Sequence, residues 1–227
     1  MKYSLILLNA IFLMAVLTGC TRAQDSAALT HENAVESGQL TKATLGAGCF
    51  WCTEALFKQL KGVKKVTAGY AGGHTKNPTY RQVATGTTGH VEVARIFFDA
   101  SIISYKQLLT VFWHVHNPTS KNRQGPDVGP QYRSVIFYHN QKQKKAALES
   151  RKKIAKSGLW DAPIVTEIEP LENFSKAENY HQNYYENNPN TAYCSTVIAP
   201  KIKKLRKQFG YLLKDEDKDE KNAEIMN

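Results

Sequence analysis

Cysteine is the residue in this chain whose type and spacing point most directly to chemistry. The 227 residues contain four cysteines, and two of them lie three positions apart in Gly48-Cys49-Phe50-Trp51-Cys52. A scaffold held together by disulfides is normally shorter and richer in cysteine. The cysteines of this chain are therefore expected to have individual roles, and a reactive thiol at Cys49 is the first candidate.

Cys49 lies where a glycine-containing loop enters a predicted helix. The amides of a first helical turn stabilise a negative charge, so we expect the pKa of Cys49 to fall below the ordinary value of about 8.5. Phe50 and Trp51 follow directly and provide apolar walls suited to a small methyl-bearing group. The alternative is a structural cysteine between two core aromatics, but the glycines and paired aromatics favour the reactive interpretation.

The C-x-x-C spacing of Cys49 and Cys52 leaves two other chemistries open. It is typical of thioredoxin-type dithiols and also of half a zinc site. Zinc would need two further ligands, and the histidine pair His114 and His116 lies in a mostly apolar predicted helix. We therefore expect no metal and no cofactor. A thioredoxin-like dithiol–disulfide oxidoreductase using Cys49 and Cys52 stays open as an alternative function.

Helical and strand patterns alternate around these cysteines. Strands are predicted at 43–45, 63–70, 91–99, 134–138 and 164–168. Helices are predicted at 51–62, 104–116, 141–157 and 200–212, and a short helix is predicted to begin at a capping box at 175–178. Strand 91–99 is apolar on both faces, which is typical of a central strand. This order predicts an α+β fold, a two-layer α/β sandwich with a mixed, partly antiparallel sheet and a ferredoxin-like core.

Three polar segments interrupt this pattern, at 74–89, 117–131 and 186–199. Long loops in a compact domain are usually functional. We expect the three segments to converge on one rim of the domain. The last contains Cys194 among Tyr, Asn and Pro residues, and it is expected to be irregular and mobile.

The first residues have the composition of a targeting segment. Lys2 precedes an apolar run at 5–17, which is too short to span a bilayer and suits a secretory signal peptide at 1–19. The segment Leu17-Thr18-Gly19-Cys20 is similar to a bacterial lipobox, which implies cleavage before Cys20 and its lipidation. We therefore expect an exported lipoprotein anchored to a membrane of the bacterial cell envelope.

Composition also divides the rest of the chain. Residues 20–40 are polar and predict a flexible tether, the folded catalytic domain is placed at 41–212, and residues 213–227 predict a charged, disordered tail. The formal net charge is +10, but the lysines are scattered and the dense block at 201–207 alternates with apolar residues. Such a block is typical of a solvated helix face, so we expect no nucleic-acid partner.

Several short sequence blocks, in order along residues 42–210, complete the case. They are Gly48-Cys49-Phe50-Trp51 with Glu54, Gly69-Tyr70-Ala71-Gly72-Gly73, Asn77-Pro78-Thr79-Tyr80, Gly89-His90-Val91-Glu92, His116-Asn117-Pro118-Thr119, Asn122-Arg123-Gln124-Gly125-Pro126-Asp127-Val128-Gly129, Gln131-Tyr132-Arg133-Ser134, Tyr180-His181-Gln182 and Tyr193-Cys194. Together they resemble the peptide methionine sulfoxide reductase A family. Because the match spans nearly the whole predicted domain, it is far more specific than any single short motif.

The resemblance implies a role for each matching polar side chain. Cys49 attacks the sulfoxide sulfur, and Glu92 protonates the sulfoxide oxygen. Tyr80 and Tyr132 hydrogen-bond that oxygen, and Asp127 supports the same network. The physics agrees for Glu92, because desolvation on a buried strand disfavours its charged form and keeps its proton in place.

The resemblance also implies the binding wall and the thiol that ends the cycle. Phe50 and Trp51 hold the S-methyl group of the substrate. Attack by Cys49 leaves a sulfenic acid on its sulfur, and Cys194 matches the thiol that resolves it to a disulfide. Cys52 departs from the commoner motif, which has glycine there. We therefore expect Cys194 to be the direct resolver, with a disulfide through Cys52 left open.

The expected function is that of a peptide-methionine (S)-S-oxide reductase. The resemblance implies preference for the S epimer, action on methionine sulfoxide in proteins or as the free amino acid, and regeneration by a thioredoxin-like reductant. We expect the enzyme to be a monomer that is attached to a membrane through its lipid anchor.

Overall fold

A six-stranded sheet is the framework of the computed structural model, which describes residues 40–215. Its strands are β1 (Thr41–Ala47), β2 (Val63–Ala71), β3 (Val91–Phe98), β6 (Ser134–Tyr138), β7 (Glu167–Pro170) and β8 (Phe174–Lys176). Their order is β7-β6-β1-β3-β2-β8, and every pair is antiparallel except β6 with β7. The predicted α+β fold with a mixed sheet is confirmed; the ferredoxin-like core stays a prediction.

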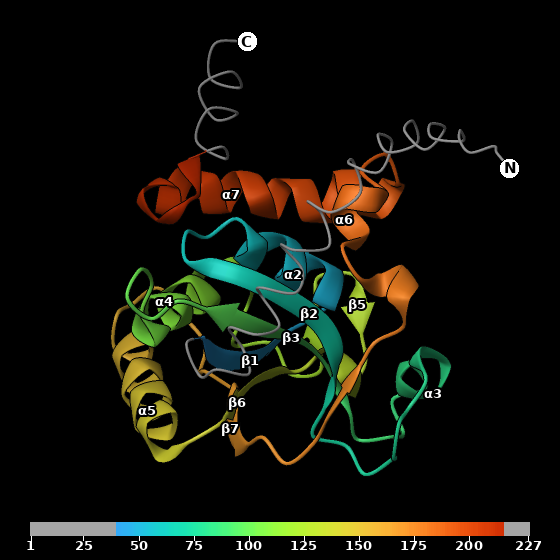
Figure 1. Cartoon of the computed structure of the whole chain (residues 1–227). Coiled ribbons are helices and arrows are strands. Elements are labelled where there is room, and N and C mark those ends of the chain that lie inside the picture. Colours follow the sequence, from blue (N-terminus) through green and yellow to red (C-terminus); the bar gives the residue numbers. More distant parts are fainter. Residues whose placement is uncertain (1–39, 216–227) are drawn as a thin grey trace, which may run out of the picture.

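Helices cover mainly one face of this sheet. The longer ones are α2 (Phe50–Lys58), α4 (Tyr105–Val115), α5 (Gln141–Ala155) and α7 (Ala199–Phe209). Figure 1 shows α7 lying over α2, which in turn lies over the sheet, with α4 and α5 to one side. Leu45, Ile96, Phe112 and Leu205 are fully buried between these layers. Each such side chain contributes roughly 1.5–3 kcal/mol by leaving water.

The strand period of two decides which side chains meet the helices. On β3, Ala94 and Ile96 belong to the large core under the helices, whereas Val91 and Val93 belong to a smaller cluster on the opposite face. Glu92 therefore points to the same face as Ala94. A carboxyl is thus placed under α2, at the level where that helix begins.

Two predicted elements are wrong in position or type. The strand predicted at 164–168 begins at Glu167, because the Val165 amide donates to Pro118 and the Thr166 hydroxyl bonds Ser134. The helix predicted to begin at the capping box at 175–178 does not form there: Ser175 and Lys176 belong to strand β8, paired with β2, and only a 3₁₀ helix at Asn179–His181 follows. The predicted capping box does not form because the Glu178 carboxylate accepts hydrogen bonds from Tyr70 and Tyr80 instead.

The remaining differences are in lengths and loops. The helix predicted at 51–62 ends at Lys58, since Leu60 leaves it to form a bridge with Leu213. The loop predicted at 74–89 contains a short helix, α3 (Tyr80–Ala84). The loop predicted at 117–131 contains a small hairpin of β4 (Arg123–Gln124) and β5 (Asp127–Val128).

The end of the chain differs most from its prediction. After the short helix α6 (Tyr184–Asn187), Cys194–Ile198 forms a π-helix that runs directly into α7. The segment around Cys194 is therefore helical rather than irregular, and its sulfur is fully buried. π-helical turns are rare and occur frequently at functional sites.

Several predictions fall outside the described residues. These are the signal peptide, Cys20, nearly all of the tether and the tail beyond Asp215. Within residues 40–215, none of the helices has the length and apolar character required to cross a membrane.

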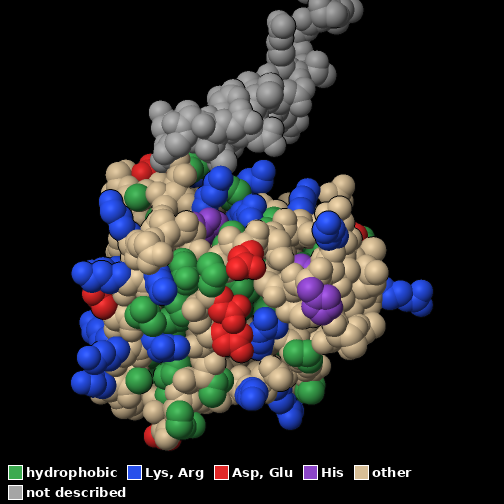
Figure 2. Space-filling view, turned by 90° about the horizontal axis from the view of Figure 1, so that it is seen from below, with side chains coloured by type: hydrophobic (Ala, Val, Ile, Leu, Met, Phe, Trp, Pro, Cys, Tyr) green, Lys and Arg blue, Asp and Glu red, His purple; other side chains and the backbone are tan. Residues whose placement is uncertain are grey.

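Figure 2 shows the Lys and Arg side chains spread over one face, with acidic side chains gathered near its centre.

Candidate active site

Cys49 is the N-cap residue of α2, as the sequence predicts. The preceding Gly48 has φ +87°, a conformation that L side chains rarely adopt, and a Cβ there would lie 2.5 Å from Gln124 Cβ. Gln124 is fixed in turn, since its side chain accepts from the Asn117 amide and donates to the Asn117 carbonyl. Glycine at position 48 thus lets the β4–β5 hairpin pack against the loop that presents the thiol.

The electrostatics of the thiol differ from the prediction. Burial raises the pKa of Cys49 well above its ordinary value, because its side chain is only 5% exposed. The expected lowering by the helix N-terminus is wrong for Cys49, since desolvation outweighs it. The low-pKa thiol is Cys52, whose pKa is lowered to about 7 by a hydrogen bond from Cys49 and by the positive charge of Lys201.

Cys52 faces Cys49 because three positions separate neighbours on one helix face. Each thiol shifts the pKa of the other, as close neighbours do. On its other sides, the Cys52 sulfur lies 3.3 Å from Lys201 Nζ and 3.8 Å from the Tyr193 hydroxyl. The two thiols therefore form one buried pair with a cation beside it.

Glu92 lies beneath the start of α2. Its carboxyl is 2% exposed, and Oε2 accepts a hydrogen bond of 3.0 Å from the Phe50 amide. Burial raises the pKa of Glu92 to about 8. The carboxyl is therefore neutral at pH 7, and because Oε2 serves as acceptor, Oε1 is the oxygen that can carry and donate the proton.

Tyr80 and Tyr132 reach the same place from two different loops. Burial and the neighbouring Glu92 raise the pKa of both phenols, so each stays a hydrogen-bond donor at neutral pH. Tyr80 opens α3, and its amide donates to Glu178 at 2.8 Å. The other oxygen of Glu178 accepts from the Tyr70 hydroxyl, so this carboxylate ties α3 to strand β2.

Asp127 meets the site through a tyrosine that the sequence did not single out for chemistry. The Tyr193 hydroxyl donates to Asp127 Oδ2 at 2.7 Å and lies beside Cys52. The loops at 117–131 and 186–199 therefore do converge here, and the 74–89 segment joins them where Gln131 donates to Ala84. Only the Tyr193-Cys194 pair in the sequence could have pointed to this residue.

The aromatic wall is larger than Phe50 and Trp51. Phe50 is 1% exposed and lies 4.9 Å from the His181 ring, whereas Trp51 is half-buried and stacks on Tyr184 at 3.6 Å. Trp51 Nε1 donates to His181 Nδ1, which fixes the indole. Tyr80 lies 4.5 Å from the same imidazole. His181 therefore joins Phe50, Trp51 and Tyr80 into one cluster, a role that no spacing in the sequence predicts.

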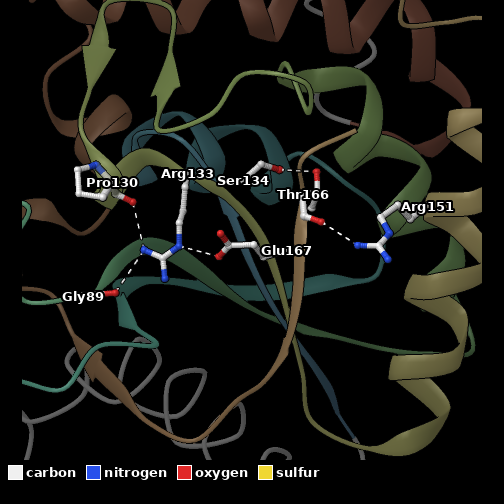
Figure 3. A network of polar contacts seen from close by, with 7 residues as sticks. All are labelled: Gly89, Pro130, Arg133, Ser134, Arg151, Thr166 and Glu167. Carbon is white, nitrogen blue, oxygen red and sulfur yellow. Dashed lines mark hydrogen bonds and ion pairs between the residues drawn. The ribbon is translucent and has the colours of Figure 1, made fainter. Parts of the chain in front are cut away.

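Arg133 holds two of the loops that carry site residues. Figure 3 shows its guanidinium reaching the carbonyls of Gly89 and Pro130 and the carboxylate of Glu167. Gly89 lies three residues before Glu92, and Pro130 opens the turn that contains Tyr132. These contacts of Arg133 therefore help to fix the relative positions of Glu92 and Tyr132.

Cys194 is placed less directly. It begins the π-helix and is fully buried in the main core, with no hydrogen bond to Cys49 among the described contacts. The structure therefore brings together Cys49, Cys52, Glu92, Tyr80, Tyr132 and Asp127, and it places Cys194 in the π-helix that packs against α2.

Comparisons with known proteins agree with one another. A family model described as peptide methionine sulfoxide reductase matches residues 41–212. A peptide methionine sulfoxide reductase from Natronomonas pharaonis is 53% identical over 167 residues, covering 74% of this chain and 94% of its own. Another from Chromobacterium violaceum is 51% identical over 176 residues, covering 78% and 100%.

Solved structures give the same result. Mxr1 from Saccharomyces cerevisiae in its reduced form is similar with a TM-score of 0.64 and 32% identity, covering 69% of this chain and 90% of that one. Methionine sulfoxide reductase A of Corynebacterium diphtheriae is similar with a TM-score of 0.61 and 34% identity, covering 67% and 77%. The family model, the sequence relatives and the solved structures thus indicate one family, and the solved structures share its fold.

Proposed function

Because the chain belongs to the peptide methionine sulfoxide reductase family and reduces methionine sulfoxide, we propose that Cys49 is the nucleophile and Glu92 the acid of that reaction. The observation that carries the assignment is the Glu92 carboxyl, buried and held by the Phe50 amide at the start of α2. A sulfoxide becomes a good electrophile only when its oxygen accepts a proton. A carboxyl that is neutral at pH 7 supplies that proton beside the attacking sulfur.

The first half of the reaction follows from these positions. The S-methyl group lies against Phe50 and Trp51, and the sulfoxide oxygen accepts hydrogen bonds from Tyr80 and Tyr132. Cys49 sulfur attacks the sulfoxide sulfur while Glu92 protonates the oxygen. The oxygen then passes from the substrate sulfur to the Cys49 sulfur: a new S–O bond forms on Cys49, the substrate S–O bond and the transient sulfur–sulfur bond break, methionine leaves, and Cys49 is left as a sulfenic acid. Asp127 acts on this site through Tyr193.

The second half needs a thiol, and the geometry favours Cys52. Cys52 lies on the helix that Cys49 caps, three positions along it, and Lys201 Nζ lies 3.3 Å from its sulfur, whereas Cys194 lies in the π-helix and has no hydrogen bond to Cys49 within residues 40–215. We assign the first disulfide to Cys49 and Cys52, and Cys194 enters afterwards by thiol–disulfide exchange when its helix opens. This revises the expectation from the sequence that Cys194 resolves directly. A thioredoxin-like dithiol then restores the reduced enzyme.

The test measures reduction of methionine-S-sulfoxide, free and in a peptide, by wild type, Cys49→Ser and Cys52→Ser. We expect Cys49→Ser to lose all reduction. Cys52→Ser still forms one methionine per enzyme without reductant, because its Cys49 attacks normally. If Cys52→Ser forms no methionine, the thioredoxin-like alternative replaces this assignment; if Cys49→Ser still reduces substrate, Cys49 is not the nucleophile.

For location, we keep the proposal of an exported, lipid-anchored enzyme. It rests on the apolar run at 5–17 and the Leu17-Thr18-Gly19-Cys20 segment. Mass spectrometry of the mature protein tests it directly. An acylated N-terminal Cys20 supports the anchor, and an unmodified Cys20 rules it out.

A further inference from the structure

Lys201 makes a contact that the family signature does not explain. It lies in the first turn of α7, and its Nζ donates to the Cys52 sulfur at 3.3 Å. Cys52 is 1% exposed, so little water competes with this ammonium group. The Tyr193 hydroxyl lies 3.8 Å from the same sulfur on the side of Asp127.

We infer that Lys201 is a positioning residue for the second half of the reaction, holding Cys52 as the thiolate that attacks the Cys49 sulfenic acid. The inference rests on the proposed function, because it needs Cys49 as the nucleophile. Lys201 acts only through Cys52 and does not touch the substrate sulfur. The positive charge of Lys201 explains why Cys52 acts as a reactive thiol and does not serve only as a small side chain that fills the core.

Among the titratable groups around Cys52 within residues 40–215, Lys201 is the one that carries a positive charge. Cys49 lies on the same helix, Tyr193 and Lys201 come from the C-terminal segment, and Glu92 comes from β3. Glu92 is neutral at pH 7, because burial raises its pKa to about 8. Tyr193 is neutral too, because burial and both thiols raise its pKa. The neighbouring Cys49 first and the Lys201 charge after it lower the pKa of Cys52 to about 7, and the ammonium lies 3.3 Å from the sulfur, where it favours the thiolate.

The atoms and charges balance through both steps. The reduced site holds a Cys49 thiol, a Cys52 thiolate and a protonated Glu92. As Cys49 attacks, its proton passes to Cys52 and the Glu92 proton passes to the sulfoxide oxygen. Cys52, acidic beside Lys201, then releases that proton to solvent, and its thiolate attacks Cys49 sulfur; the S–S bond forms, the S–O bond breaks, and the hydroxide leaves as water with a proton from solvent. The products are methionine, water and a disulfide, with Glu92 left as the carboxylate.

The experiment compares full-length wild type, Lys201→Gln, Lys201→Arg and Lys204→Gln in single turnovers without reductant. Lys204 is an exposed residue of the same helix and serves as the matched control. Two quantities are followed from pH 6 to 9: methionine formed, and the lifetime of the sulfenic acid as trapped by a diketone reagent. Peptide mapping then identifies the disulfide. Circular dichroism establishes that each variant is folded.

The expected change is in the pH profile of resolution. If Lys201→Gln returns the Cys52 pKa to about 8.5, the thiolate fraction at pH 7 falls roughly 15-fold. The less acidic thiolate is intrinsically about five-fold more nucleophilic, so resolution slows only about three-fold at pH 7. Above about pH 8 the thiolate fractions of the two proteins become similar, so the greater nucleophilicity of the variant thiolate makes the variant resolve faster than wild type. A merely structural defect would slow resolution at every pH and produce no crossing.

The outcomes separate this inference from the proposed function. Both the proposed function and the role of Lys201 are supported by the following result. All four proteins form one methionine per enzyme, the pH profile of resolution crosses that of wild type only in Lys201→Gln, and Lys201→Arg behaves as wild type. Parallel profiles in folded Lys201→Gln overturn the role of Lys201 and leave Cys49 and Glu92 in place. A Cys49–Cys194 disulfide formed first in wild type, with Cys52 still a thiol, also overturns the inference. Absence of methionine in wild type would instead overturn the proposed function.

Discussion

At the scale of single residues, the protonation of Glu92 controls the first chemical step. Burial raises the pKa of Glu92 to about 8, whereas an unfolded glutamate titrates near 4.3. The acid is present below pH 8 and lost above it. Sulfoxide reduction should therefore decline as pH rises through about 8. This holds even though the cysteine thiolates become more abundant there.

Glu92→Gln tests this directly. Glutamine preserves the acceptor for the Phe50 amide but has no acidic proton, so the rate of methionine formation should fall about 10²–10⁴-fold. The decline above pH 8 should disappear in the variant. Single-turnover methionine release from pH 6 to 9 measures both. A variant with more than a tenth of the wild-type rate would show that another group donates the proton.

The pH dependence of the free energy of unfolding provides a control for Glu92→Gln. Between pH 4.3 and 8 the unfolded glutamate has lost its proton and the folded one has kept it, so the folded state loses stability as pH rises across this window. Glutamine removes that loss. Glu92→Gln should therefore be as stable as wild type near pH 4.5 and more stable at pH 8, by an amount on the order of a few kcal/mol. Urea unfolding at the two pH values checks the sign.

At the scale of elements, two capping boxes of the same type serve different ends. Ser104 and Gln107 cap α4, which is buried in the core, and Thr79 and Gln82 cap α3, which begins with Tyr80. In each case the side-chain oxygen of the glutamine accepts from the amide of the capping residue at 2.9 Å. The first cap supports the fold, and the second supports the position of a phenol.

Alanine at each cap should separate these roles. Ser104→Ala should lower the free energy of unfolding by about 1 kcal/mol and leave kcat/KM unchanged. Thr79→Ala should lower kcat/KM by roughly three- to ten-fold with a smaller effect on global unfolding, because α3 is short and can open locally. Each variant is the control of the other. Equal effects of the two on kcat/KM would contradict a special role for the α3 cap.

The C-terminal elements show why the cysteines could not be ranked from spacing. Cys52 is near Cys49 because both lie on one helix, and this proximity follows from the C-x-x-C alone. Lys201 and Tyr193 reach Cys52 only because α7 packs against α2. The π-helix at Cys194–Ile198 buries the other thiol, although the Asn- and Pro-rich sequence just before it is typical of a loop.

At the scale of the whole molecule, the C-terminal end of the domain closes against the end of α2. Lys61 donates to the Leu212 carbonyl, Lys214 donates to the Gln59 carbonyl, and Leu60 and Leu213 form the bridge between them. Leu60 and Leu213 are both fully buried. The helix that carries both reactive thiols is thus held at its far end by residues about 150 positions later in the chain.

Leu213→Ala should therefore destabilise the whole domain. Removing a fully buried leucine side chain is expected to cost about 2–5 kcal/mol in the free energy of unfolding. Tyr211, two residues earlier, is 64% exposed, and Tyr211→Ala should change stability by less than about 0.5 kcal/mol. Denaturant unfolding of the two variants gives the comparison. A loss below 1 kcal/mol in Leu213→Ala would mean that this end of the chain does not support the domain.

The sequence by itself determined the fold class, the central strands, the helix that starts at Cys49 and the nearness of Cys49 to Cys52. These are local consequences of apolar period, capping and helical spacing. Only the tertiary structure decided which thiol is acidic and that Cys194 lies in a π-helix, and it added Tyr193, Lys201 and His181 to the site. Burial and cross-element contacts depend on how distant segments pack, and no local pattern contains that information. For the same reason, no helix begins at the predicted capping box at 175–178: Ser175 and Lys176 end strand β8, and Glu178 instead accepts hydrogen bonds from Tyr70 and Tyr80.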